Sequence, residues 1–572
     1  MTSIQSILAD AAGELPDKPL FVFPETRWRP AAALTYAELA RRAGGAARVI
    51  AGAARPGDRA LLLFPTGPEF WEAFFGCLAA GVIAVPLKTP NVNRTSEQLE
   101  RIVRDCGPAL LLTDGPTGEI LRKRAESHPY LNGITLLTPA EWAGEERDLV
   151  VRGTNIEPAY LQYTSGSTSH PKATQVSHAS LLANAELIRQ RMEVRRGDDS
   201  TVTWLPHYHD MGLVGSYLGT IYNRLIAHCL PPEEFVLHPA RWLQLISEHS
   251  ATICGGPTFG YRLCAEKVRD EELVGVDLSR WRVAYIGAER IEPATLRSFS
   301  GRFAPSGFRH AALFPCYGLG EATLLVTGGP AAGPPVCRDV SQSALLRGQI
   351  AAPANDSDRM SLAGSGGVAP GCDVVIADPA TGRRLPDSNI GEVLVAGAGV
   401  TAGYYRRAEL NRELFRDVER SGDVRPFLRT GDLGFLSDGE LFITGRLKEM
   451  MIVRGRNLYP EDVEGPAGRA HEAVSPGRVV AFSVDHGGEE ALVVAAELHR
   501  SAVKLESGRP VIDAVRAQIV AACGVSPTEI VLLRPAMIPM TSSGKLQRLA
   551  VRDSYMSGGL ECLFREQLPP GT

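Results

Sequence analysis

Short apolar runs alternate with helical patterns over the first 140 residues of the chain. The runs at residues 58–64, 81–87, 109–113 and 133–138 show no alternation of apolar and polar positions. Residues 70–80, between the first two runs, have the apolar spacing of a helix. Strands that are apolar on both faces and are separated by helices predict a parallel sheet with helices on both sides. We therefore expect an α/β fold for this part of the chain.

The same alternation of short apolar runs and helical patterns resumes after residue 172 and runs to about Gly328. The stretch from 330 to 370 is polar and weakly periodic, which predicts a long loop without regular structure. Short strands return in residues 372–400 and predict a small antiparallel β unit. A boundary near Gly445 leaves about 125 residues for a smaller domain of its own.

One helix start is clear from the residues alone. Thr35 is a suitable N-cap for a helix over residues 34–42, and Glu38 follows at the spacing of a capping box.

Composition restricts the class of protein. The chain has 572 residues, 44% apolar and 22% charged, with a formal net charge of −5, so nothing general attracts it to nucleic acid or to an anionic membrane. Ten cysteines without a CxxC pair predict neither a zinc framework nor disulfides, and favour a cytoplasmic protein. We see no signal peptide and no apolar run of membrane-spanning length, and we expect no membrane insertion.

The stretch from Tyr163 to Lys172 is dominated by small and hydroxyl-bearing residues. Such a loop offers N–H and O–H donors to an anion, and Lys172 adds a charge. A strand at 159–163 and a helix at 178–191 are predicted on either side, the arrangement of a phosphate-binding loop. Pro171 and Ala173 exclude a Walker A loop. Taken alone, the stretch fits a flexible surface loop equally well.

Further motifs are individually weak. The His207–Met211 stretch could be a metal cluster, a substrate pocket or a loop of satisfied histidines, and no other His or Cys group completes a metal site. Glu321, beside two glycines after an apolar run, suits a carboxylate that holds Mg²⁺ between phosphates. Asp432 lies in a tight Gly-Asp turn, which suits a ribose diol or is an ordinary turn. Lys545 follows small residues and would otherwise be a solvated charge.

In their order and spacing, these motifs resemble the ANL superfamily of adenylate-forming enzymes over nearly the whole chain, from Thr35 to Arg548. The chain is most similar to the fatty acyl-AMP ligases. Residues 204–212 (WLPHYHDMG) resemble a signature of that group, as do residues 430–442 together with 454–460. The long segment after Gly329 falls where that group carries an insertion.

The resemblance implies a fold and two half-reactions. It implies a large N-terminal domain at 1–444 with an insertion at about 337–362, a hinge at 445–448 and a mobile α+β domain at 449–572. A fatty acid would attack ATP to give acyl-AMP, and the acyl group would then pass to the phosphopantetheine thiol of an acyl carrier protein supplied in trans. Lys448 occupies the hinge position.

The resemblance also implies roles for individual residues. The β- and γ-phosphates would contact Thr164, Ser165, Gly166, Ser167, Thr168 and Lys172. Glu321 would hold Mg²⁺, and Thr323 would touch the α-phosphate. Adenine would lie against Tyr317 and Gly318, above Gly287, Ala288 and Glu289. Asp432 and Arg446 would bind ribose, Lys545 would bridge the carboxylate and the α-phosphate, and His209 would line the entry of the carboxylate.

The acyl pocket is less defined by the residues. Residues 251–261 contain no carboxylate, which favours an apolar acid over an amino acid. The candidate tunnel residues, which fit an ordinary core as well, are Met211, Leu213, Cys254, Gly256 and Phe259. One departure from the superfamily is Ala173, where a Gly is usual. If that position needs a positive φ, Ala would cost on the order of 1 kcal/mol.

Two other functions remain open at this point. The first is a fatty acyl-CoA ligase, and we hypothesise that residues 337–362 pack against the small domain and disfavour the use of CoA. The second is a catalytically silent nucleotide- or carrier-binding protein, against which Glu321 and Lys545 argue. A hydrolase is disfavoured because the chain has no Gly-x-Ser-x-Gly elbow.

Overall fold

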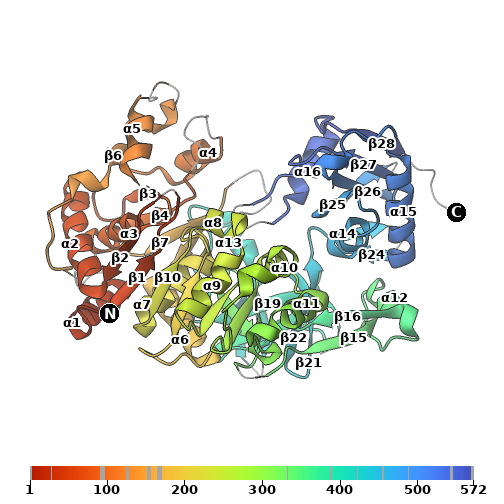
Figure 1. Ribbon diagram of the computed structural model, residues 1–572, viewed down its shortest axis with the longest axis horizontal. Helices are drawn as coiled ribbons and strands as arrows, with labels where there is room; N and C mark the ends of the chain where they lie inside the picture. The colour runs from red at the N-terminus through yellow and green to blue at the C-terminus, as the bar shows by residue number, and fades with distance from the viewer. Residues whose placement is uncertain are drawn as a thin grey trace.

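The computed structural model describes residues 3–27, 29–89, 97–123, 126, 128–150, 156–163, 171–331, 333–386, 389–420, 423–453, 456–486, 489–541 and 545–567. The elements up to β22 form a large lobe, and those from α14 to β28 gather in a separate smaller lobe (Figure 1). Among the described helices, none combines the length and the apolar character needed to cross a bilayer.

The N-terminal part of the large lobe is built on a six-stranded sheet in the order β6-β5-β3-β4-β7-β8. All neighbours are parallel except β7 and β8. The predicted parallel sheet is therefore confirmed. Its strands are β3 Arg59–Leu63, β4 Ile83–Pro86, β5 Leu110–Thr113, β6 Thr135–Leu137, β7 Tyr160–Tyr163 and β8 Ala173–Val176, and its helices are α2 Tyr36–Ala53, α3 Pro68–Ala80, α4 Glu97–Cys106 and α5 Gly115–Lys123. The capping box of Thr35 and Glu38 starts α2 as predicted.

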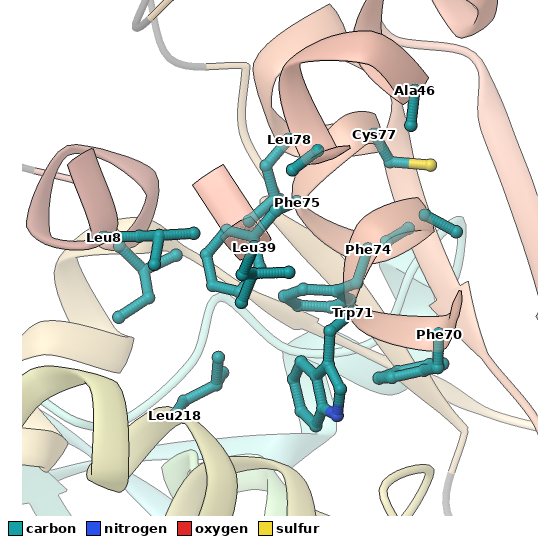
Figure 2. Close-up of a cluster of buried hydrophobic side chains, with 14 of the residues drawn as sticks. Leu8, Leu39, Ala46, Phe70, Trp71, Phe74, Phe75, Cys77, Leu78 and Leu218 are labelled. Carbon is teal, nitrogen blue, oxygen red and sulfur yellow. The ribbon is translucent and has the colours of Figure 1, made fainter. Parts of the chain in front are cut away.

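The core of this region surrounds α3, whose long side chains are buried around the helix (Figure 2). The ring of Trp71 lies 4.9 Å from that of Phe21 and 4.8 Å from that of Tyr217. Gly76 lets α2 approach, since a Cβ there would lie 2.8 Å from the Cβ of Ala46. Because Tyr217 belongs to a π-helix, η4 (Met211–Leu218), this core also fixes the segment that lines the site described below.

A second sheet, in the order β2-β1-β10-β9, joins the two halves of the large lobe. β1 and β10 pair in parallel, as do β10 and β9. Its strands are β1 Pro19–Phe23, β2 Ala32–Thr35, β9 Ser200–Thr203 and β10 Ile226–Cys229. The other α-helices of the large lobe before residue 304 are α1 Ile4–Glu14, α6 His178–Arg191, α7 Gly219–Asn223, α8 Pro232–Leu237, α9 Ala240–Glu248, α10 Thr258–Lys267 and α11 Pro293–Phe303.

The third sheet has ten strands and changes from parallel to antiparallel along its width. Three parallel strands continue without a break into the antiparallel strands, in the order β11-β12-β13-β14-β17-β22-β21-β19-β18, with β20 on β21. The antiparallel unit expected from residues 372–400 is therefore an extension of the α/β sheet. Its elements are β11 Ile253–Pro257, β12 Val283–Gly287, β13 Leu313–Gly318, β14 Leu325–Gly328, β17 Gly367–Val368, β18 Cys372–Ala377, β19 Gly391–Gly397, α13 Ala408–Leu414, β20 Phe415–Arg420, β21 Asp423–Ser437 and β22 Glu440–Arg446.

The segment predicted to be a structureless loop is folded, so that prediction is wrong. β15 (Cys337–Ser341) pairs with β16 (Arg359–Ala363), and α12 (Gln342–Leu345) follows β15. The backbone N–H and C=O groups of this segment are satisfied by strand pairing. The spacing of apolar residues in the sequence gives no sign of such pairing. The segment also contacts the small lobe: Leu346 packs in its core and accepts a hydrogen bond from the Asn457 N–H at 2.8 Å.

The small lobe has α+β architecture. Its sheet runs β25-β26-β27-β28, with β26 and β27 parallel and the outer pairs antiparallel. Its strands are β23 Met451–Val453, β24 Arg456–Leu458, β25 Val474–His486, β26 Glu489–Leu498, β27 Glu529–Leu533 and β28 Phe564–Gln567, and its helices are α14 Pro460–Gly468, α15 Arg509–Cys523 and α16 Arg548–Met556.

The expected strand-loop-helix order around residues 163–178 needs one correction. β7 and α6 are where the sequence predicts them, but β8 intervenes, so the helix does not start at the end of the loop. Ala173 is the first residue of β8, is fully buried, and its carbonyl accepts a hydrogen bond from the Tyr405 N–H at 2.8 Å. A strand position does not need a positive φ, so Ala173 introduces no strain there.

We expect Ala173→Gly to lower stability by about 0.5–1 kcal/mol, because glycine loses more conformational entropy in a strand. The midpoint of urea unfolding measures the change. Gly133→Ala is the matched control: Gly133 has φ +82, so there the alanine is the destabilising residue. A gain in stability from Ala173→Gly would contradict the extended conformation of this position.

Candidate active site

A cavity of about 1760 Å³ lies between the two lobes. Its walls include Lys172 and Tyr317 of the large lobe and Lys545 of the small lobe. Pockets that bind one small molecule have volumes of roughly 300–1,000 Å³. The cavity therefore has room for a nucleotide and a second ligand together.

Asp432 and Arg446 face each other across β21 and β22. Arg446 Nε lies 3.1 Å from Asp432 Oδ1, and the Tyr317 hydroxyl donates to Asp432 Oδ2 at 2.7 Å. The Asp432 carboxylate raises the pKa of Arg446 above its ordinary value. Asp432 is 5% exposed, so its carboxylate is held in one orientation beside the cavity. Such a carboxylate is a suitable acceptor for two adjacent hydroxyls.

Glu321 lies in a short turn, Gly320–Ala322, between β13 and β14. The Tyr404 hydroxyl donates to Glu321 Oε1 at 2.6 Å, and Lys172 Nζ lies 5.4 Å from the centroid of the same Tyr404 ring. A backbone bridge between Thr174 and Tyr404 attaches this tyrosine to β8. Tyr404 therefore positions both the carboxylate and the lysine.

The donor set at Glu321 fits Mg²⁺. In sites where Mg²⁺ accompanies a nucleotide, one or two carboxylates hold the ion and phosphate oxygens complete its shell. Glu321 has a second carboxylate oxygen besides the one bound by Tyr404. The described residues include no group of three or more His, Cys, Asp or Glu side chains that could hold a metal ion. Phosphate oxygens of a bound nucleotide would therefore have to complete the shell of the ion.

Lys545 reaches the cavity from the small lobe, where its backbone N–H donates to Thr541 Oγ1 at 3.0 Å. Burial lowers the pKa of the Lys545 amine, and the Arg446 guanidinium lowers it further. The carboxylates that partly offset these effects are Asp210, Glu289 and Asp432. The amine is thus surrounded by charged groups of the large lobe.

Lys172 shows the same electrostatic pattern. Burial is the largest effect that lowers the pKa of Lys172, followed by the charge of Lys448, while Glu321 acts in the opposite direction. Lys448 also lines the cavity. Cations from several segments are therefore held close together, which favours an anionic ligand.

The two histidines predicted as a possible cluster have separate environments. His209 lines the cavity, with Nδ1 2.7 Å from Asp210 Oδ1. Burial opposes ionisation of Asp210, but the charge of His209 and its hydrogen bond hold the pKa of Asp210 below its ordinary value. His207 is 2% exposed and packs on Phe70, and burial lowers its pKa to about 3. A joint metal site is therefore excluded for this pair.

Part of the wall of the cavity is apolar, and we call this part the apolar branch. Met211 and Phe259, two of the candidate tunnel residues, belong to it. Leu213 and Cys254 are fully buried in the core instead, and Gly256 packs against Trp204, where a Cβ would lie 2.7 Å from the indole. The other apolar or small wall residues that we group under this name are Ile188, Met192, Gly215, Gly219, Leu225, Ile253, Leu263 and Leu324.

Thr323 is placed differently from the expected contact with phosphate. Its side chain is 1% exposed, and its hydroxyl donates to the Gly399 carbonyl at 2.7 Å. It has φ +66, so it shapes the turn after Glu321. Gly287 is also outside the cavity wall, since a Cβ there would lie 2.4 Å from the Cys316 carbonyl oxygen.

The remaining predicted residues divide into two groups. Gly318, Ala288 and Glu289 line the cavity. Thr164, Ser165, Gly166, Ser167 and Thr168 lie outside the described residues, but Tyr163 and Lys172 on either side of them line the cavity. Sequence reasoning missed Tyr404, because a tyrosine after a strand has no distinguishing signal.

Together, the fold and the cavity define a two-lobed nucleotide-binding enzyme. Residues 8–405 match the model of the AMP-binding enzyme family. The chain belongs to this family, within the ANL superfamily of adenylate-forming enzymes.

Relatives over nearly the full length agree with this assignment. The medium-chain-fatty-acid–[acyl-carrier-protein] ligase JamA of Moorena producens is 35% identical, over 92% of this chain and 90% of JamA. The long-chain-fatty-acid–AMP ligase FadD26 of Mycobacterium tuberculosis is 33% identical, over 98% of each chain. The 4-hydroxyphenylalkanoate adenylyltransferase of Mycobacterium marinum is 34% identical, over 99% of this chain and 93% of the relative.

Solved structures show the same similarity. A structure from a study of fatty acyl-adenylate ligases of E. coli and L. pneumophila has a TM-score of 0.85 and 31% identity, over 98% of each chain. The fatty acyl-adenylate ligase of L. pneumophila in complex with acyl adenylate and pyrophosphate has a TM-score of 0.74 and 31% identity, over 99% of this chain and 98% of the other.

We expect Tyr404→Phe to weaken the binding of a divalent cation with ATP by about fivefold, since one hydrogen bond that orients Glu321 contributes about 1 kcal/mol. Titration of Mn²⁺ in the presence of a non-hydrolysable ATP analogue, followed by electron paramagnetic resonance, measures this. Tyr405→Phe is the control, because Tyr405 is outside the cavity wall. Equal Mn²⁺ affinity in both variants would show that Tyr404 does not position Glu321.

Proposed function

We propose that the protein uses ATP to convert a fatty acid into an acyl-adenylate and passes the acyl group to the phosphopantetheine thiol of an acyl carrier protein. The observation that carries this proposal is the convergence of Lys172, Arg446 and Lys545 on one cavity whose wall is apolar in part. Cations suit the triphosphate, and the apolar branch suits an acyl chain. The ligase names of the full-length relatives support the same substrate class.

In the first step, a carboxylate oxygen of the fatty acid bonds to the α-phosphorus, and pyrophosphate leaves with the electrons of the broken P–O bond. His209, beside the apolar branch, lines the entry of the carboxylate. Lys545 neutralises charge between the carboxylate and the α-phosphate. Positioning two anions in line and screening their repulsion is the main task of the protein here.

The nucleotide is proposed to be held by groups of the large lobe. Asp432 accepts from the ribose hydroxyls, and Arg446 adds a donor beside them. The adenine lies against Tyr317, Gly318, Ala288 and Glu289, and the β- and γ-phosphates contact Lys172 and residues 164–168. Glu321 would hold Mg²⁺, which would screen the charge of the phosphates.

In the second step, the thiol sulfur bonds to the acyl carbon, AMP leaves with the electrons of the C–O bond, and the thiol proton passes to solvent. We propose that residues 1–444 and 449–572 act as two domains and that residues 445–448, with Lys448, form the hinge between them. The ten cysteines are free in the structure, which agrees with action in the cytoplasm.

The contact of α12 with the small lobe supports a role for residues 337–362 in partner choice. The Gln342 side chain donates to the Ala522 carbonyl, and Leu346 is part of the core of the small lobe. We propose that this contact limits rotation of the small lobe and disfavours the use of CoA. The alternative, a fatty acyl-CoA ligase, differs in the product formed.

The direct test supplies the enzyme with a fatty acid, ATP and either CoA or a separate holo-carrier protein, and follows products by mass spectrometry. We expect acyl-AMP and acyl-carrier, with little acyl-CoA. Lys545→Ala should slow pyrophosphate exchange by about 100-fold or more, as for other lost charge-stabilising groups. Lys504→Ala, an exposed lysine of the same lobe, is the control. Abundant acyl-CoA, or full exchange without Lys545, would contradict the proposal.

We expect Gly215→Leu to shorten the longest fatty acid accepted by several methylenes, while short acids remain substrates. Gly215 lines the apolar branch, and a Cβ there would lie 3.0 Å from Leu324 Cδ2. Acyl-AMP formation across a series of chain lengths measures the change. Gly301→Ala, at a glycine with open space around it, is the control. An unchanged chain-length profile would place the acyl chain elsewhere.

A further inference from the structure

A buried ion pair joins the two lobes, and both of its residues line the cavity. Arg290 follows β12 of the large lobe, and Asp462 is in the first turn of α14 in the small lobe. Arg290 Nη1 lies 2.5 Å from Asp462 Oδ1. The side chains are 14% and 6% exposed, so water barely screens the pair. Such a pair holds its geometry strongly, because separating it leaves a charge without a partner unless water enters.

The helix that carries Asp462 also anchors the segment of Lys545. Arg548, at the start of α16, has Nε 2.7 Å from Glu464 Oε1 and Nη2 2.9 Å from Glu461 Oε1, and both glutamates are on α14. Its Nη1 lies 2.8 Å from Glu449 Oε2. Arg548 is three positions after Lys545 in the chain. α14 therefore links the ion pair of the two lobes to the position of the catalytic amine.

The large-lobe end of the pair adjoins the site directly. Glu289 precedes Arg290, lines the cavity, and is one of the carboxylates whose charge acts on Lys545. Glu289 Oε1 accepts a hydrogen bond from the Phe259 N–H at 2.6 Å, which fixes this part of the chain. A short rigid path thus runs from the large lobe through Arg290 and Asp462 to Lys545.

We propose that Arg290 and Asp462 are positioning residues that hold the small lobe in the orientation for adenylation, and that their pair separates when the lobe turns for acyl transfer. This inference rests on the proposed two-step function. The pair touches neither nucleotide nor fatty acid in the proposal. It acts by keeping Lys545 at the reacting atoms, and it must open before another face of the small lobe can meet the acyl-adenylate.

The proposal predicts an effect on one half-reaction only. In Asp462→Asn, the kcat of pyrophosphate exchange should fall by about tenfold or more, as expected when a buried charge loses its partner. The KM for ATP should change less than about twofold, because Asp432, Arg446 and Lys172 remain in the large lobe. Transfer from supplied acyl-AMP to a holo-carrier protein should proceed at the wild-type rate or faster.

The double variant and a control separate positioning from general damage. Arg290→Met should reproduce the effect of Asp462→Asn, and combining both should add little, since each removes the same pair. Asp270→Asn breaks an ion pair with Arg302 inside the large lobe, and should leave both half-reactions unchanged. Thermal unfolding of every variant reports whether the fold is intact.

Several results would overturn the proposal. Equal losses in adenylation and transfer would show that the pair only stabilises the fold. A raised KM for ATP with unchanged kcat would show that the pair acts on nucleotide binding and does not position Lys545. Wild-type exchange in Asp462→Asn would show that the pair has no role. If wild-type protein itself forms no acyl-AMP, the proposed function fails, whereas failure of this inference alone leaves the wild-type activity in place.

Discussion

Crowding of positive charge in one partly buried cavity is the constraint on which the site depends. Lys172, Lys448, Arg446 and Lys545 come from both lobes. Burial first, and then the neighbouring cations, lower the pKa of Lys172 and of Lys545. Glu321, Asp432 and Glu289 offset part of this repulsion. The arrangement costs stability without an anion, and the charges are already in place when one binds. In the proposed function, a nucleoside triphosphate relieves the repulsion and is itself neutralised.

The scaffold explains why these charges meet. The ten-stranded sheet brings the end of β13 near the β21–β22 pair, so that Tyr317 reaches Asp432. The aromatic core around α3 packs against Tyr217 of η4, and Met211 and Gly215 of the same π-helix line the cavity. The small lobe contributes Lys545, and its position depends on α14 and Arg548. The sheets of the large lobe thus hold most of the charged side chains of the cavity. Lys545, in contrast, belongs to the lobe that is proposed to move.

Local signals in the sequence predicted the parts of the fold that are set locally. The capping box at Thr35, β7 and the limits of α6 all follow from residues within a few positions. β8 was missed because a four-residue strand after a small-residue loop has too little pattern. The β15–β16 hairpin was missed because pairing of backbone groups stabilises it, and its apolar spacing is weak. These are effects of tertiary context on short segments.

In the site, too, the features set by local sequence were predicted and those set by tertiary contacts were not. Motif order identified Lys172, Glu321, Asp432, Arg446 and Lys545, all of which line the cavity. Thr323 shares its motif but turns inward, since its positive φ directs its hydroxyl to Gly399. Tyr404 and the Arg290–Asp462 pair carry no signal in sequence, because their partners are 83 and 172 positions away. The sequence therefore predicts which residues of a motif line the cavity. Contacts between residues far apart in the chain become visible only in the folded structure.

Proton uptake on nucleotide binding tests this electrostatic account most directly. Calorimetry of a non-hydrolysable ATP analogue, in two buffers of different ionisation enthalpy, reports it at a pH somewhat below the 10.5 of an ordinary lysine. The account predicts net uptake of protons, because the triphosphate restores the charge of Lys172 and Lys545. Binding without uptake, or with release of protons, would contradict the claim that crowded cations await an anion in this cavity.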